Sequence, residues 1–78
     1  MIFDELKELI KTELGVEAAN STLATTLQDM GADSLDAAEL IMAIEEKYEI
    51  QIAEVDAEQF TSLGSIVAYI ETKQRGRE

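Results

Sequence analysis

The sequence contains no cysteine and no histidine. Without cysteine the chain has no disulfide framework, no thiolate nucleophile and no thiolate ligand for zinc. The missing histidine removes the commonest general base and metal ligand near neutral pH. We therefore expect a protein that catalyses no reaction by itself. The cysteine-free composition also favours the cytoplasm or another reducing compartment.

Long apolar runs and a basic leader are missing as well. The longest uninterrupted apolar run is Leu40–Ile44, which is far too short to cross a bilayer. No basic stretch followed by an apolar one opens the sequence, so we expect neither a signal peptide nor a membrane span. The 78 residues are enough for one small domain with a thin margin of stability.

Positive charge is scarce. The sequence has 6 Lys and Arg against 17 Asp and Glu, which gives a formal net charge of −11. This balance repels nucleic acid and anionic membrane surfaces, and it favours a partner with a basic surface. Because 46% of the residues are hydrophobic, we expect a folded domain and not an acidic disordered tail.

Apolar residues recur at helical spacing in three stretches. The first predicts a helix over residues 2–14, followed by Gly15 at the position where a left-handed residue ends a helix. The second predicts a helix over residues 34–48, and the third a helix over residues 62–73. A brief helix between them is indicated by Val55, Ala57 and Phe60. Since strand signals are weak, we predict an all-α four-helix bundle with three longer helices, a short third helix and a long first loop.

The first loop covers residues 16–33 and shows no strong periodicity. Such a long loop in a small domain suggests a functional role or an unrecognised short helix. We expect four apolar side chains to pin it to the core, namely Val16, Leu23, Leu27 and Met30. The predicted domain ends at residue 73, and the polar tail 74–78 is expected to fray.

The most informative segment lies where this loop meets the second helix. Its sequence Gly-Ala-Asp-Ser-Leu-Asp occupies residues 31–36. Asp33 is typical of an N-cap, with Asp36 three residues later facing the first-turn amides. Ser34 then stands in the first turn with an exposed hydroxyl, beside backbone N–H groups that would stabilise an attached anion such as a phosphate ester. The alternative is that Ser34 only helps to cap the helix.

A second stripe follows the face of this helix opposite the core. It contains Leu35, Glu39, Met42 and Glu46, with Asp36 and Glu45 at its flanks. Apolar anchors among carboxylates predict a docking surface for a basic partner, because the anchors give affinity and the charges steer the approach. The alternative is a solvated acidic face with two incidental apolar residues.

The acidic residues do not form a recognisable metal or catalytic motif. Asp29, Asp33 and Asp36 lie close together, but Ser34 stands where the EF-hand pattern requires glycine and Leu40 where it requires glutamate. We therefore expect no dedicated metal site. No single acid stands out as buried, so hydrolysis by a carboxylate pair is also disfavoured.

Residues 31–36, continued by Glu39–Glu46, closely resemble the acyl carrier proteins of dissociated (type II) fatty acid synthesis. The resemblance extends to the first helix with its ending at residues 14–16, and to residues 57–70. It implies a four-helix bundle whose Ser34 is esterified by 4′-phosphopantetheine, transferred from coenzyme A by a separate transferase. Asp33 matches the acid before the modified serine. The thiol of the arm would carry acyl groups in fatty acid synthesis or in a specialised lipid or polyketide pathway.

The same resemblance implies two further sets of residues. The positions that match contacts with the transferase and with acyl-processing enzymes, whose docking surfaces are basic, are Leu35, Asp36, Glu39, Met42, Glu45 and Glu46. The positions expected to shelter the acyl chain are Leu40, Ile44, Tyr48, Ile52, Ala57, Phe60 and Val67. We expect a monomer. The competing hypothesis is an acidic helical interaction module that carries no prosthetic group.

Overall fold

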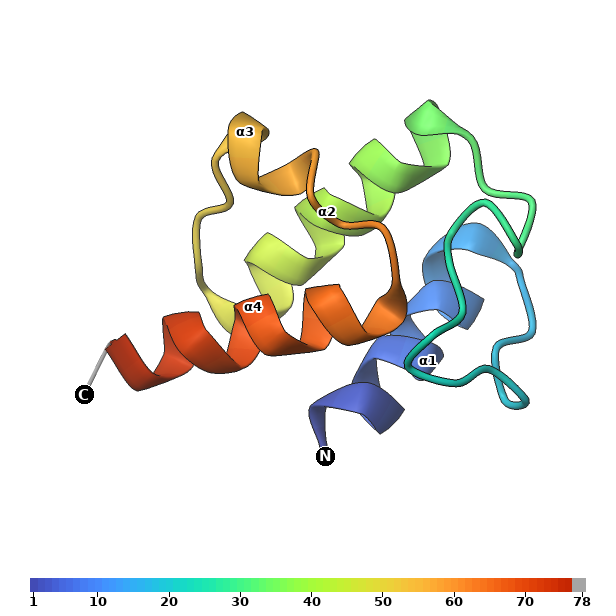
Figure 1. Cartoon of the computed structure of the whole chain (residues 1–78), viewed down its shortest axis with the longest axis horizontal. Coiled ribbons are helices and arrows are strands. Elements are labelled where there is room, and N and C mark those ends of the chain that lie inside the picture. Colours follow the sequence, from blue (N-terminus) through green and yellow to red (C-terminus); the bar gives the residue numbers. More distant parts are fainter. Residues whose placement is uncertain (77–78) are drawn as a thin grey trace.

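The computed structural model describes residues 1–76 and contains four helices (Figure 1). Their bounds are Ile2–Leu14 for α1, Ser34–Tyr48 for α2, Glu54–Ala57 for α3 and Leu63–Gly76 for α4. Residues 1–76 contain no strand, and one isolated antiparallel bridge joins Thr26 to Ser62. The predicted all-α fold with a short third helix and a long first loop is confirmed.

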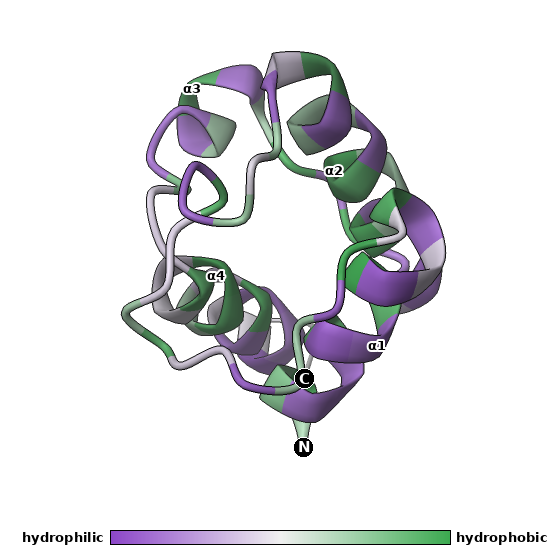
Figure 2. Ribbon diagram, turned by 90° about the vertical axis from the view of Figure 1, so that its right-hand side faces the viewer, coloured by the Kyte–Doolittle hydropathy of each residue, from purple (hydrophilic) through white to green (hydrophobic). Residues whose placement is uncertain are grey.

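The helices surround a common interior, with α1 and α2 on one side of the view in Figure 2 and α3 and α4 on the other. α1 packs against both α2 and α4. The core takes residues from these three helices and from two connecting segments: Leu6, Ile10, Ala18, Leu40, Ile44, Tyr48, Ile50, Leu63, Ile66 and Ile70. The apolar stripes predicted for the three longer helices are therefore the faces that meet in the core.

α1 has the predicted limits because its end carries a strong local signal. Gly15 adopts the left-handed conformation with φ 69°, and its N–H donates to the carbonyl of Lys11 at 3.0 Å. Glycine adopts this conformation without the steric penalty of a side chain. The helix therefore stops here, and the chain turns into the long loop.

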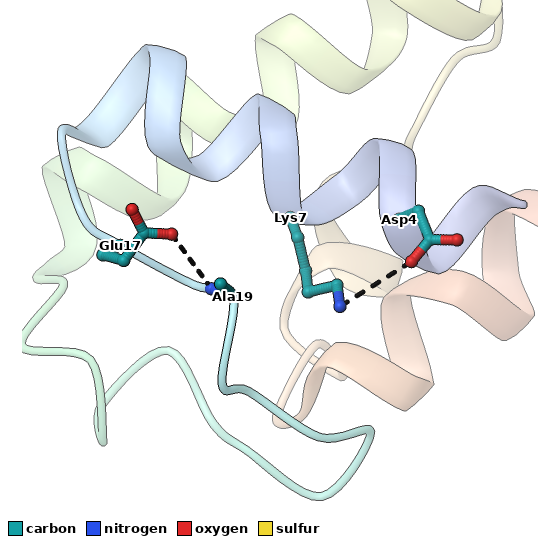
Figure 3. A network of polar contacts seen from close by, with 4 residues as sticks. All are labelled: Asp4, Lys7, Glu17 and Ala19. Atoms are coloured by element: carbon teal, nitrogen blue, oxygen red, sulfur yellow. Dashed lines mark hydrogen bonds and ion pairs between the residues drawn. The ribbon is translucent and has the colours of Figure 1, made fainter.

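An ion pair attaches the start of the loop to α1, and Figure 3 shows the neighbouring polar contacts within the loop and within α1. The backbone N–H of Ala19 donates to Glu17 at 3.2 Å, and the ammonium group of Lys11 lies 3.5 Å from the other oxygen of that carboxylate. Lys7 pairs with Asp4 at 3.7 Å on the same side of α1. Ion pairs with at least one partner mostly in water contribute little to stability, so the buried side chain of Ala18 is the main anchor here.

Further along, the loop is fixed by turns and by α4, and it contains no short helix. Leu27 and Met30 pack against the core as predicted, as does Val16. The expectation for Leu23 is wrong, because its side chain is 52% exposed. Its carbonyl instead accepts a hydrogen bond from the N–H of Gly64 at 2.8 Å, and the N–H of the preceding Leu63 donates to the loop in the same way. Leu23 thus holds the loop through its backbone.

Gly64 allows this close approach. A Cβ atom at Gly64 would lie 3.0 Å from the carbonyl oxygen of Leu23 and 3.2 Å from its Cβ. We expect Gly64→Ala to destabilise the fold by about 1 kcal/mol in thermal unfolding, although alanine is the better helix former. Gly76→Ala is the matched control, since no atom from the non-neighbouring residues in the described part of the chain lies within 4 Å of its added Cβ. A more stable Gly64→Ala variant would contradict this packing argument.

α4 is longer at its C-terminal end than the sequence predicted. It includes Gln74, Arg75 and Gly76, and the remaining residues 77–78 lie outside the described part of the chain. Lys73 and Arg75 occupy the last turn, where positive charge interacts favourably with the helix dipole. Within residues 1–76, no helix is long and apolar enough to span a membrane.

Candidate functional site

α2 begins with a complete capping box. The side chain of Asp33 accepts a hydrogen bond from the N–H of Asp36 at 2.9 Å, and the side chain of Asp36 accepts one from the N–H of Asp33 at 3.3 Å. This reciprocal pair provides acceptors for two backbone N–H groups, one in the first turn and one on the N-cap residue. The N-cap prediction for Asp33 is confirmed. The first turn of α2 therefore has a fixed geometry.

The chain reaches this cap through a tight turn. Gly31 has φ 77°, and its N–H donates to the carbonyl of Gln28 at 3.0 Å. The next N–H, of Ala32, donates to the carbonyl of Leu27 at the same distance. The left-handed backbone of Gly31 favours glycine at this position. Since Leu27 packs on the core, the turn connects the start of α2 to the interior.

Ser34 is the first residue of α2, and its side chain is exposed. Its hydroxyl has no hydrogen-bond partner among residues 1–76, and the N–H groups of Ser34 and Leu35 have no acceptor in that part of the chain either. Unpaired first-turn N–H groups at the positive end of a helix dipole stabilise an anion. The geometry fits a hydroxyl that can be esterified by a phosphate group.

The cap itself can be tested. We expect Asp33→Ala to lower the stability of the domain by about 1 kcal/mol, because the N–H of Asp36 loses its acceptor. For a domain of this size that corresponds to a fall in Tm of about 4–8 °C. Asp33→Asn removes the same charge but keeps an oxygen acceptor, so its Tm should stay near that of the parent. An equal fall in both variants would attribute the effect to charge.

The predicted docking stripe is exposed along α2. Leu35 is 67% exposed and Met42 is 61% exposed, and Glu39 and Glu46 are exposed beside them. Large apolar side chains at this exposure are not required by the core. Val55 on α3 is exposed to the same degree, although the sequence indicated only that it belongs to a short helix with Ala57 and Phe60.

The two flanking acids are less accessible than the rest of the stripe. Asp36 is half-buried and belongs to the capping box. Glu45 is half-buried too, and its carboxylate accepts a hydrogen bond from the N–H of Ile52 at 2.9 Å. Both carboxylates therefore have structural partners within the chain. Their charge still adds to the acidic face.

Residues 4–70 of the chain match the family model described as a phosphopantetheine attachment site. An acyl carrier protein from Clostridium perfringens is 49% identical over 70 residues, which cover 88% of this chain and 92% of the relative. The chain belongs to the acyl carrier protein family. Another acyl carrier protein, from Chlamydia caviae, is 43% identical over 72 residues, which cover 91% of this chain and 94% of the relative.

A solved structure agrees in fold. The crystal structure of an acyl carrier protein from Thermotoga maritima superposes with a TM-score of 0.91, covering 99% of this chain and 91% of that one at 16% identity. As a member of the acyl carrier protein family, the chain is a carrier and not an enzyme. The prosthetic group of the family is phosphopantetheine, which supplies the thiol that a cysteine-free chain lacks.

The structure places the seven predicted acyl-chain residues at different depths. Three of them, from α2, are buried in the core: Leu40, Ile44 and Tyr48. The other four are half-buried around α3 and on α4: Ile52, Ala57, Phe60 and Val67. All of them except Ala57 belong to one packed interior. Any acyl chain that enters must therefore displace existing side-chain contacts.

Two tyrosine–carboxylate hydrogen bonds were not predicted. The Tyr48 hydroxyl donates to Glu5 at 2.6 Å and joins α2 to α1, while the Tyr69 hydroxyl donates to Asp56 at 2.9 Å and joins α4 to α3. In both pairs the pKa of the tyrosine is raised above its usual value. Burial of the tyrosine is the larger cause, and the neighbouring carboxylate is the next. Both hydroxyls thus remain donors at neutral pH. No local sequence pattern marks such long-range pairs.

Proposed function

We propose that Ser34 is the residue to which 4′-phosphopantetheine is attached, and that the chain carries acyl groups as thioesters on this arm between enzymes of fatty acid synthesis or of a specialised lipid or polyketide pathway. The observation that carries this proposal is the exposed Ser34 hydroxyl without a partner in residues 1–76, next to two unpaired N–H groups at the start of α2. An esterified phosphate is favourable there. Asp33 positions this turn through the capping box.

The exposed stripe on α2 supports a proposal about partners. Leu35 and Met42 would provide apolar contacts, and Glu39 and Glu46 would attract the basic docking surfaces of the transferase and of acyl-processing enzymes. Asp36 and Glu45 would contribute mainly through their charge, because both carboxylates already accept hydrogen bonds. We further propose that the chain acts as a monomer in the cytoplasm, consistent with its net charge of −11 and its lack of cysteine.

The interior supports a proposal about cargo. An acyl tail that moved into the region of Leu40, Ile44, Tyr48, Ile52, Ala57, Phe60 and Val67 would gain about 0.8 kcal/mol for each CH₂ group that it buries. The same tail would have to open a packed core. Sheltering should therefore be partial and should depend on chain length.

The test is the intact mass of the protein before and after incubation with coenzyme A, Mg²⁺ and a broad-specificity phosphopantetheinyl transferase. We expect a gain of one phosphopantetheinyl group, and fragmentation of the product should place it on Ser34. A folded and initially unmodified protein that gains no mass would favour the acidic interaction module instead. A gain on another residue would reject Ser34 as the site.

A further inference from the structure

α3 is the helix least embedded in the core. None of its four residues is buried, and Val55 is two-thirds exposed. A hollow of about 370 Å³ lies between α3 and α4, with Asp56, Gln59, Phe60, Ser65, Ala68, Tyr69 and Thr72 around it. In Figure 1, α3 forms a single turn above α4. On the side that faces α4, close packing of apolar side chains therefore does little to hold α3 in place.

Side chains of Asp56, Phe60 and Tyr69, which we call the clasp, bridge the hollow. Tyr69 on α4 donates to the Asp56 carboxylate at 2.9 Å, and its ring centroid lies 5.2 Å from that of Phe60 at an interplanar angle of 71°. A hydroxyl donating to an ionised carboxylate forms a stronger bond than a neutral pair, and edge-to-face rings attract each other. The Lys73 ammonium, 5.4 Å from the Tyr69 centroid, adds a cation–π contact.

The segment around α3 is thus held at two points. Before the helix, the N–H of Ile52 donates to Glu45 on α2 at 2.9 Å. After the helix, the clasp joins Asp56 and Phe60 to α4. Ile52 and Phe60 also turn apolar surface toward the core. Opening of the clasp would release α3 from α4 while its first attachment holds, and would uncover the side of Phe60 that now faces Tyr69.

We propose that the clasp formed by Asp56, Phe60 and Tyr69 sets the minimum length of acyl chain that the interior shelters. This inference rests on the proposed function, in which an acyl chain attached through Ser34 enters the interior. The gain from burying a tail grows with each CH₂ group, while the free energy needed to open the clasp is fixed. Short chains gain too little to open it, and long chains gain enough.

The first arm of the test uses the unmodified protein and needs no cargo. We expect Tyr69→Phe, which keeps the ring and removes only the hydroxyl, to speed hydrogen exchange of the Ala57 and Glu58 amides about tenfold. Asp56→Ala should raise the exchange rate to a similar degree. The double variant should show no further increase, because both substitutions remove the same hydrogen bond. The matched control is Tyr48→Phe, which loses a hydroxyl bonded to Glu5 and should not selectively speed exchange in α3. Unchanged α3 exchange in Tyr69→Phe overturns the clasp.

The second arm loads Ser34 with butyryl, octanoyl or palmitoyl phosphopantetheine and measures the rise in Tm over the thiol form. Relative to the parent, Tyr69→Phe should show a palmitoyl rise larger by about 4 °C and an unchanged butyryl rise. Tyr69→Phe could show faster α3 exchange while its rise in Tm depends on acyl-chain length just as in the parent. That result would overturn the proposed control of chain length. A parent that accepts no phosphopantetheine rejects the proposed function, and the control of length with it, whereas the exchange arm still decides whether the clasp holds α3.

Discussion

Replacing Ser34 by alanine should abolish attachment of phosphopantetheine completely while leaving the fold intact. The attachment needs the hydroxyl oxygen, and no other group at the start of α2 can replace it. The fold should survive because this hydroxyl has no partner in residues 1–76 and because alanine is favourable in the first turn of a helix. Intact mass after incubation with coenzyme A and a transferase measures the first effect, and Tm measures the second.

The matched control for that variant is Ser21→Ala. Ser21 lies in the long loop, where its hydroxyl is 3.9 Å from the sulfur of Met30. This variant should gain the full mass of one phosphopantetheinyl group. If Ser34→Ala still gained the group, attachment would occur elsewhere. If Ser34→Ala unfolded, the side chain would have a structural role that its exposure does not indicate.

Leu6→Ala should be among the most destabilising single changes in the protein. Leu6 is fully buried in α1, so the truncation removes apolar contacts and leaves a cavity, at a cost of about 2–5 kcal/mol. A domain of this size has a total stability of roughly 4–12 kcal/mol. The variant should therefore show a much lower midpoint in urea unfolding, or should fail to fold at 37 °C.

Leu35→Ala is the same chemical change on the exposed face of α2. It should alter the free energy of unfolding by no more than about 0.5 kcal/mol, because the Leu35 side chain is mostly in water. Because both variants replace leucine by alanine, the difference between their free energies of unfolding reports the effect of burial. A loss in Leu35→Ala as large as in Leu6→Ala would mean that the stripe on α2 is covered in solution and is not available for docking.

Local signals were sufficient to predict α1 and α2. Their limits agree with the predicted 2–14 and 34–48, because Gly15 ends one helix and Asp33 begins the other. Both residues act on neighbours within four positions, so their effect is visible in the sequence. The end of α4 was placed too early because a polar composition was interpreted as disorder, whereas the last-turn Lys73 and Arg75 fit a helix.

Interactions between distant segments were not predictable in the same way. The exposed side chain of Leu23 and the need for glycine at position 64 have one cause, the close passage of the loop over the start of α4. Glu45 was assigned to the partner surface from its angle on the helix, but its hydrogen bond to Ile52 depends on the path of the next segment. The contact between Tyr69 and Asp56 likewise depends on tertiary arrangement and has no short-range pattern.

The two hydrogen bonds from α4 to the long loop also bear on the order in which parts of the fold form during synthesis. Thr25 and Leu23 accept them from Leu63 and Gly64, which leave the ribosome long after Ser34. Until then both carbonyls lack these partners, and the loop that leads into α2 is held only by its own turns and by its contacts with the rest of the core. A nascent chain therefore presents the serine and its capping box before the loop has its attachments to α4. α4 then completes the attachment of the loop that leads to the site.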